Sequence, residues 1–548
     1  MRGLHVGRTQ QPTEEQVAVL RKPATQARLI GLKCEGVDQF AHVHHGSAGR
    51  RGRADAALSA LRDEGVTGPA LLASVSLSRR TQLSRGHDGH VSDGLFGELF
   101  GRGGAAPSDQ DWLQAMLDTE AALARAVERA GLAPAGAGAA VTAAARAENF
   151  DVAHIGRAAV LIGNPVSALV RALSAAVPPG AREAVHRGAT SQDIIDTAVM
   201  LLARRGADVI DADLVAAADQ AARLAREHTS TVMAGRTLLQ QAVPVTFGLV
   251  AAGWLTAIDE ARHELRVVRT TRLAVQFGGA AGTLASLGDA GPALAALLAE
   301  ELGLSDPVLP WHTDRLRIVQ LAAALAGVCA ALGMVARNAT LLAQTEVAEV
   351  AEGGDAPGQG GSSAMPHKRN PVVSVLILGC TRRAPGLLAT LAAAAEQEHQ
   401  RAAGAWHAEW ETLSELLRLT GSAASWSASL LSGLRVDPAR MRANLDATGG
   451  LPLAEHVSTV LAPALGRLAA HELVAAASDR AASQGVSLPE ALLGHEPTAA
   501  TLRAAGIGAA ELAAAADPAG YLGAAAEFVR RALAAHGGAN GETQASVG

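Results

Sequence analysis

The chain's most regular apolar pattern reads LAAALAGVCAALGMVARNATLL from Leu321 to Leu342. Its apolar side chains recur at alternating spacings of four and three residues, which places them along one face of a helix as a heptad seam. Such a seam is stable only when a facing helix buries it, so the stretch predicts a long helix inside a bundle. The seam positions are Leu321, Leu325, Val328, Leu332, Val335, Ala339 and Leu342.

Helical patterns also precede and follow this seam. Ser108 offers an N-cap before an apolar helical face, and the stretches 249–273 and 371–398 are long enough for many turns, the second with a kink expected at Pro385. A short extended piece is expected near Thr231–Val245. Aromatic residues make up only 3% of the chain, so the core must be built from Leu, Val, Ile and Ala, which suits closely packed helices. The sequence therefore predicts an all-α protein with a long central helical bundle.

Changes in composition divide the chain into four regions. Residues 1–92 are rich in Gly, Arg and Ser and carry too little apolar surface to fold alone, so they are predicted to form a poorly ordered extension. Its His42, His44 and His45 are interpreted as part of a solvated loop, because no carboxylate or cysteine stands at metal-ligand spacing. The other regions are predicted as an N-terminal helical domain (93–205), a central long-helix bundle (206–447) and a small C-terminal helical domain (448–548).

Composition and charge argue against several classes of protein. The 548 residues carry 47 basic and 53 acidic side chains, and the net charge of -6 provides no general attraction to nucleic acid or anionic lipid. The three cysteines lie too far apart for a disulfide framework or a zinc site, which indicates a reducing, cytoplasmic setting. We expect no membrane span, because the longest apolar run, 321–336, is shorter than the roughly 20 residues that cross a bilayer. We expect no signal peptide either, since the N-terminus lacks a continuous apolar stretch.

The segment with the most chemical information reads GQGGSSAMPHKRNP over residues 358–371. Its glycines indicate a mobile loop, and Asn370-Pro371 predicts the N-cap and first position of a helix. The loop carries the hydroxyls of Ser362 and Ser363 and one of the chain's three lysines, Lys368. Beside the positive end of a helix dipole, these groups would suit a carboxylate ligand. A flexible polar loop is the alternative, but such a loop has no need of a lysine where arginine is otherwise used.

The pattern G-S-S-x-M-P-x-K-x-N-P in this segment resembles the signature of the fumarase/aspartase superfamily, whose members add or eliminate a group β to a carboxylate. Two other stretches are similar to the superfamily's remaining substrate-binding regions, HRGATSQDIIDT at 186–197 and GRTLLQQA at 235–242. The resemblance implies catalysis by Ser362 and Lys368 and substrate binding by Thr190, Ser191, Gln240, Ser363, Asn370 and Arg315. It also implies a homotetramer whose sites are assembled from separate subunits, and it implies no metal and no organic cofactor.

One departure from the superfamily pattern bears on the reaction. Members that release an amine or add water carry a histidine for acid-base chemistry at the heteroatom, and this chain has Leu238 in that place. Such reactions need a proton transfer at nitrogen or oxygen, whereas a carboxylate nucleophile attacks as an anion and needs none. The resemblance therefore favours the lactone-forming cycloisomerases of the superfamily, which act on a small tricarboxylate, over a fumarate-releasing lyase such as adenylosuccinate lyase.

The reaction that this branch of the superfamily implies begins when one substrate carboxylate attacks the carbon β to another. A five-membered lactone closes, and Ser362 would deliver the proton that the α-carbon then needs. Outside enzymes, the alternative is an inactive helical-bundle scaffold. Retention of Ser362, Lys368 and Asn370 together argues against a scaffold, since packing alone requires none of them.

Overall fold

A computed structural model of the protein describes residues 95–353 and 359–545, with side chains described up to residue 538. The predicted extension with His42, His44 and His45 lies outside the described residues, and so does Gly358 of the glycine-rich loop. Helices dominate the described part, where the named strands form two short antiparallel pairs. The predicted all-α fold class is confirmed.

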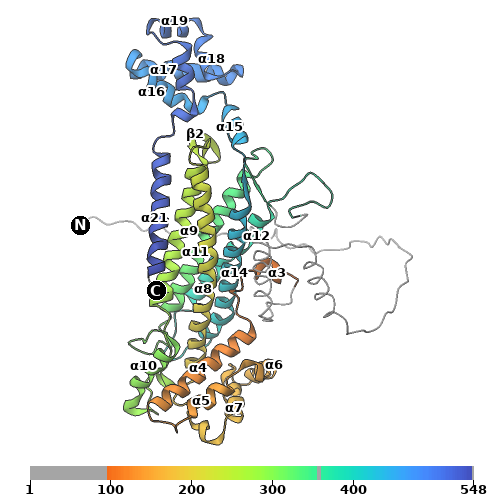
Figure 1. Ribbon diagram of the computed structural model, residues 1–548, viewed down its shortest axis with the longest axis vertical. Helices are drawn as coiled ribbons and strands as arrows, with labels where there is room; N and C mark the ends of the chain where they lie inside the picture. Colours follow the sequence, from red (N-terminus) through yellow and green to blue (C-terminus); the bar gives the residue numbers. More distant parts are fainter. Residues whose placement is uncertain (1–94, 354–358, 546–548) are drawn as a thin grey trace, which may run out of the picture. The chain divides into compact units, whose positions relative to one another are not determined.

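The centre of the fold is a bundle of long helices (Figure 1). Its members are α8 (Ser191–Glu227), α9 (Phe247–Thr271), α11 (Leu316–Leu342), α12 (Val372–Thr381), α13 (Ala384–Ala393) and α14 (Ala405–Gly433). The predicted heptad seam lies on α11, which packs against α9, α12, α13 and α14. Every seam side chain is buried, with at most 6% of its surface exposed. The heptad prediction is therefore confirmed.

Shorter helices surround the end of the bundle at which α8 begins (Figure 1). They are α4 (Asp109–Arg129), α5 (Ala137–Ala144), α6 (Val152–Ala159), α7 (Val166–Ala176) and α10 (Gly291–Leu302), while α3 (Gly97–Phe100) packs on α14. The predicted N-cap of α4 is confirmed: Ser108 Oγ accepts a hydrogen bond from Asp111 N at 3.1 Å, and Asp111 Oδ2 accepts one from Ser108 N at 2.9 Å. This reciprocal capping fixes where α4 starts. Short 3₁₀ helices here are η2 (Ala147–Asn149), η3 (Pro179–Ala184), η4 (Gly279–Ala281) and η5 (Gly288–Ala290).

The C-terminal region has a small hydrophobic core of its own. Its elements are α15 (Pro438–Asp446), η6 (Leu451–Leu453), α16 (Ala454–Leu465), α17 (Arg467–Gln484), α18 (Leu488–Leu493), α19 (Glu496–Ala504), α20 (Ala509–Ala515) and η7 (Pro518–Gly520). The last helix, α21 (Ala525–Ala545), instead packs along α9 and α8 of the central bundle (Figure 1). There the imidazole of His536 bridges two carboxylates, with Nδ1 2.9 Å from Asp259 Oδ2 and Nε2 3.0 Å from Asp219 Oδ1. The chain after residue 448 therefore forms a separate small core and then adds α21 to the central bundle.

The extended piece expected near Thr231–Val245 is a β-hairpin. Strand β1 (Val232–Thr237) pairs with β2 (Gln240–Thr246), and Leu238 and Leu239 form the turn with positive φ angles of 52° and 66°. A second pair, β3 (Val350–Glu352) with β4 (Leu434–Val436), joins the segment after α11 to the end of α14.

One helix prediction was wrong in its extent. The stretch 371–398 is not a single kinked helix, because α12 ends at Thr381 and α13 begins at Ala384 with Pro385 in its first turn. Proline lacks an N–H and its ring clashes with the carbonyl four residues before it, so a proline is tolerated at a helix start but breaks a helix interior. The kink expected at Pro385 is a complete break.

Two apolar segments are long enough to cross a membrane by length and composition, α11 and the stretch Val372–Ala393. Buried core helices pass the same test, and the apolar seam of α11 is covered by neighbouring helices. The second segment is the broken pair α12 and α13, with Arg382 and Arg383 between them. Packing inside the protein therefore accounts for the apolar character of α11.

Candidate active site

The glycine-rich loop closes on itself just before α12. Asn370 N donates to the carbonyl of Gly360 at 2.7 Å, and Gly361 forms an antiparallel bridge with Arg369. Gly360 has a φ of 72°, and a Cβ atom there would stand 2.5 Å from the Asn370 carbonyl oxygen, so only glycine fits. The turn between these two stems presents residues 362–368 at the surface.

Ser362 lies in this turn with its hydroxyl held by the backbone. Its Oγ accepts hydrogen bonds from Ala364 N at 3.3 Å and Met365 N at 3.1 Å. Two amides directed at one oxygen stabilise negative charge on it, which is what an oxygen acting as proton donor or acceptor acquires when it is deprotonated. The predicted catalytic role of Ser362 stays a prediction, and the contacts of its oxygen suit that role.

Lys368 is exposed on the same turn, where its backbone N–H donates to the Met365 carbonyl at 3.1 Å. Among the described residues, no hydrogen bond or ion pair occupies its ammonium group. Ser363 is also exposed, and Asn370 is half-buried at the stem. Ser362, Ser363 and Lys368 therefore lie on one turn, with Asn370 at its stem, and their predicted roles stay predictions.

The start of α12 differs from the prediction. Asn370 does not cap the helix, which begins at Val372 after Pro371. Instead the carboxylate of Glu352, at the end of β3, accepts hydrogen bonds from Val373 N at 3.0 Å and Ser374 N at 2.8 Å. A carboxylate already occupies the positive end of this helix, so a substrate anion would have to be held by Lys368 and the loop hydroxyls rather than by the helix dipole.

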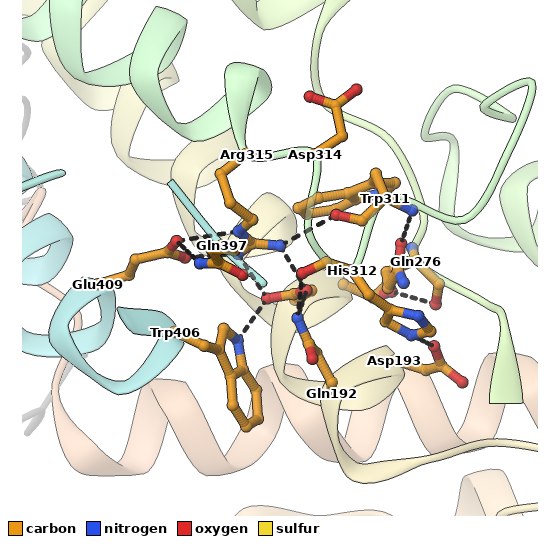
Figure 2. A network of polar contacts seen from close by, with 12 residues as sticks. Gln192, Asp193, Gln276, Trp311, His312, Asp314, Arg315, Gln397, Trp406 and Glu409 are labelled. Carbon is orange, nitrogen blue, oxygen red and sulfur yellow. Dashed lines mark hydrogen bonds and ion pairs between the residues drawn. The ribbon is translucent and has the colours of Figure 1, made fainter. Parts of the chain in front are cut away.

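Thr190 and Ser191 lie at the start of α8, where Asp193 fixes the backbone. Its buried carboxylate accepts hydrogen bonds from Thr190 N at 3.0 Å and Gly279 N at 2.9 Å, and it lies 2.7 Å from His312 Nε2 (Figure 2). Three segments of chain are thereby joined at one side chain. The arrangement presents Thr190 and Ser191, both half-buried, at the N-terminus of α8.

His186 is a residue near this helix end that the sequence reading left without a role. Its backbone has a φ of 55°, and the buried Glu120 holds it by accepting from His186 N at 2.9 Å and lying 2.7 Å from Nδ1. Burial by itself lowers the pKa of His186, but the hydrogen bond and charge of Glu120 outweigh it, so the pKa is raised above its ordinary value. Positive charge is thereby favoured four residues before Thr190. The sequence signal that could have identified His186 is its position as the first residue of the 186–197 stretch.

Arg315 is placed differently from its predicted substrate-binding role. It is 1% exposed, and Figure 2 shows it beside Glu409 of α14. Its other carboxylate partner is Asp196 of α8. Its Nη1 donates to Asp196 Oδ2 at 2.8 Å and to the Trp311 carbonyl at 3.4 Å, and Nη2 donates to Asp196 Oδ1 at 3.0 Å. Nε donates to Glu409 Oε1 at 2.9 Å, and Nη2 to Oε2 at 2.5 Å. All five guanidinium N–H groups are thus used within the protein, which makes Arg315 a structural centre rather than a substrate contact.

Gln240 and Leu238 lie at the tip of the β1–β2 hairpin. Leu238 is 96% exposed, and Gln240 is exposed at the first position of β2. Near its turn, the hairpin is anchored by Arg236, whose Nη1 and Nη2 donate to Glu349 at 2.8 and 2.5 Å. Glu349 directly precedes β3, so the hairpin and the glycine-rich loop are tied to the same end of the bundle (Figure 1).

The predicted site residues therefore divide into two groups within one chain. Thr190 and Ser191 lie at the start of α8, whereas the hairpin follows its end. Helix α8 has 37 residues, which at 1.5 Å per residue is about 55 Å. Within one chain, the two groups therefore lie too far apart to contact the same small molecule.

The described part of the chain contains no group of three or more His, Cys, Asp or Glu side chains placed to hold a metal ion. A cavity of about 1320 Å³ is lined by Phe96, Trp112, Met116 and Arg418 among others, and by none of the predicted site residues. The predicted site residues therefore lie outside this cavity.

Replacing Lys368 by methionine is expected to reduce turnover strongly while leaving helicity and melting temperature nearly unchanged, because an exposed loop cation contributes little to stability. Lys368→Arg should also be poor, since the planar guanidinium differs in shape and hydration from an ammonium. Steady-state kinetics and circular dichroism check this, with the neighbouring exposed His367→Ala as the matched control. Wild-type kinetics for Lys368→Met would mean that the loop is merely a polar connection.

An all-helical bundle that carries a serine and a lysine on one turn is the arrangement that the sequence resemblance predicts for lyases acting beside a carboxylate. The chain belongs to the lyase family of the fumarase/aspartase superfamily: a family model described as Lyase matches residues 104–386, and one described as Adenylosuccinate lyase C-terminus matches residues 450–532. The family resemblance is confirmed.

Individual relatives are similar over most of their length. 3-Carboxy-cis,cis-muconate cycloisomerase of Pseudomonas aeruginosa is 49% identical over 432 residues, covering 78% of this chain and 93% of that protein. Nitrosuccinate lyase of Streptomyces davaonensis is 48% identical over 440 residues, covering 78% of this chain and 91% of that protein. The crystal structure of 3-carboxy-cis,cis-muconate lactonizing enzyme from Pseudomonas putida is 45% identical with a TM-score of 0.76, covering 81% of this chain and 99% of that one.

Proposed function

We propose that the protein is a 3-carboxy-cis,cis-muconate cycloisomerase, which closes its substrate to 4-carboxymuconolactone in protocatechuate catabolism. The observation that carries the proposal is Leu238, an exposed apolar side chain where lyases of amines and hydroxyls carry a histidine. The cycloisomerase of Pseudomonas aeruginosa and the lactonizing enzyme of Pseudomonas putida, at 49% and 45% identity, support it.

The proposed reaction needs one new bond and one proton transfer. A substrate carboxylate attacks the carbon β to a second carboxylate, and the electron pair of the double bond moves into that second carboxylate to give an enediolate. Ser362 then delivers its proton to the α-carbon, and the oxygen left behind is stabilised by the amides of Ala364 and Met365. Lys368 supplies positive charge for the enediolate. No heteroatom of the substrate gains or loses a proton, so no acid-base residue is needed at position 238.

The proposal includes assembly as a homotetramer. The distance of about 55 Å along α8 separates Thr190 and Ser191 from the hairpin, so a complete site needs these regions from different copies of the chain. A groove of about 770 Å³ between α9 and α11 offers a surface against which another copy could pack. Its lining combines small residues such as Ala323 and Gly327 with the charged Glu260, Glu264 and Arg272. Sedimentation of the purified protein tests the tetramer, and a monomer at working concentration would contradict it.

We also propose a reducing, cytoplasmic location. Cys329 and Cys380 are free and buried in the described part of the chain. Burial raises the pKa of the Cys329 thiol to about 12, which keeps it protonated and unreactive. These cysteines behave as small core side chains, with no sign of a disulfide framework between them.

A second candidate, elimination of nitrite from nitrosuccinate, is favoured by one observation. The nitrosuccinate lyase of Streptomyces davaonensis is 48% identical, and nitrite leaves as an anion, so Leu238 is compatible with its loss too. In that reaction Ser362 would remove the α-proton rather than supply it. The two candidates therefore use the same residues in opposite proton-transfer directions.

One experiment separates these candidates. The purified protein is incubated with 3-carboxymuconate, nitrosuccinate and adenylosuccinate in turn, and ultraviolet absorbance and released nitrite are followed. We expect loss of diene absorbance with 3-carboxymuconate and no fumarate from adenylosuccinate. Nitrite release without diene loss would establish the second candidate, and efficient cleavage of adenylosuccinate would overturn the argument from Leu238.

Leu238→His is expected to give no gain in cyclisation and no hydration of fumarate, because the proposed reaction has no proton to transfer at a heteroatom. The variant should fold normally, since the side chain is exposed and histidine tolerates a φ of 52° better than leucine does. Leu239→His, on the other turn residue, is the matched control. Faster cyclisation by Leu238→His alone would show that the reaction benefits from an acid or base there, which would contradict the argument from Leu238.

A further inference from the structure

Glu352 connects the two ends of the glycine-rich loop. It lies at the end of β3, six residues before Gly358, and its carboxylate binds the first turn of α12, directly after the loop. Oε2 accepts from Val373 N at 3.0 Å, and Oε1 accepts from Ser374 N at 2.8 Å and from Ser374 Oγ at 2.6 Å. One side chain thereby fixes the spacing between the residues that begin and end the segment carrying Ser362 and Lys368.

The backbone of Glu352 is itself held in place. It pairs with Leu434 in the β3–β4 ladder, and its carbonyl accepts from Arg435 Nη2 at 3.3 Å. The next residue, Gly353, donates from its N–H to the Gly433 carbonyl at 2.8 Å, and a Cβ at position 353 would stand only 2.4 Å from that oxygen. The backbone that carries this carboxylate is therefore fixed by hydrogen bonds to the chain at the end of α14.

The partner of Glu352 is equally fixed. Ser374 has no exposed surface, and the neighbouring Val373 is also buried. The stem bond between Asn370 N and Gly360 O lies within three residues of this capped turn. Movement of the α12 start relative to β3 would therefore be passed to the stem and then to the turn that carries Ser362.

We propose that Glu352 is a positioning residue for the reaction, a clasp between β3 and α12 that sets the placement of the catalytic turn. This inference rests on the proposed function for its activity readout. Glu352 contacts neither Ser362 nor Lys368 among the described contacts and acts through the backbone. Misplacement of a reacting group by about 1 Å can cost roughly 100-fold in rate. Loss of the clasp should therefore lower kcat while KM changes little.

The test compares Glu352→Ala with Asp151→Ala. Asp151 is also a carboxylate helix cap, accepting from His154 N at 2.9 Å at the start of α6, but it has no connection to the loop. We expect both variants to melt a few degrees lower, and only Glu352→Ala to lose roughly 10- to 100-fold in kcat. Glu352→Gln, which keeps one acceptor oxygen, should recover part of the loss. A kcat within twofold of wild type for Glu352→Ala would overturn the proposal.

A second readout does not depend on any substrate. Backbone hydrogen exchange over residues 359–371 should accelerate in Glu352→Ala and stay at the wild-type rate in Asp151→Ala. If wild-type protein turns over none of the substrates, the proposed function fails, and exchange still decides whether the clasp exists. Should Glu352→Ala not fold, Ser374→Ala removes only the hydroxyl contact and should give the same change to a smaller degree. Unchanged exchange in every folded clasp variant would refute the clasp.

Discussion

Replacing Ser362 by alanine is expected to lower kcat by roughly 10²- to 10⁴-fold, the usual contribution of a positioned proton-transfer group. The loss follows because the enediolate must be protonated at carbon whichever atom attacks, and the Ser362 oxygen is the one that two loop amides hold ready for negative charge. Substrate should still bind, since Thr190, Ser191 and Lys368 are unchanged. Single-turnover kinetics and substrate binding measured by calorimetry check both parts.

Mixing variants supplies the control for this prediction. Ser362→Ala and a Thr190→Val, Ser191→Ala double variant should each be nearly inactive. If a site takes Ser362 from one copy and Thr190 from another, refolding the two together should restore turnover, because some hybrid sites then contain no substitution. Full activity of Ser362→Ala alone would remove the serine from the mechanism, and failure of the mixture to recover would argue against shared sites.

Much of the fold could be predicted because it depends on local pattern. The α11 seam is readable from spacing alone, and every seam residue is buried. The cap at Ser108 is equally local, since its partner Asp111 is three residues away. Where a local signal competed with a distant one, the prediction was less accurate: Asn370-Pro371 has the composition of a helix start, but Glu352, 21 residues before Val373, provides the cap and α12 begins at Val372.

The site, too, could be predicted only where its residues are close together in the sequence. Ser362 and Lys368 are six residues apart on one turn, so a sequence motif could place them together. The environment of Arg315 is set by Asp196, 119 residues before it, and Glu409, 94 residues after it. No spacing rule reports such partners, so a conspicuous arginine near a predicted site could not be distinguished from a buried structural one.

Arg315→Met is expected to be the most destabilising single change considered, at about 3–5 kcal/mol, the usual cost of removing one partner from a buried ion pair. Asp196 and Glu409 would both be left without their cation in a site where neither has more than 4% of its side chain exposed. Methionine fills similar space, so lost volume contributes little. Chemical denaturation measures the loss, and the matched control is Arg442→Met, whose ion pairs with Asp446 and Asp517 are about half exposed and should cost at most about 1 kcal/mol.

The free energy of unfolding that Arg315→Met loses, its stability deficit, should depend on pH because the change leaves two buried carboxylates without a cation. Burial raises the pKa of Glu409 above its ordinary value of 4.5, while the hydrogen bond and charge of Arg315 act to lower it. Without Arg315, the pKa of Glu409 in the folded protein should rise further. A carboxyl whose folded pKa exceeds its unfolded one favours the native state below about pH 4.5, and that contribution is lost as pH rises through the folded pKa. The deficit should therefore be smaller at pH 5 than at pH 8, whereas that of Arg442→Met stays small at both. A deficit that is constant over this range would mean that the lost packing of Arg315 on Trp311, not stranded charge, is what destabilises the variant.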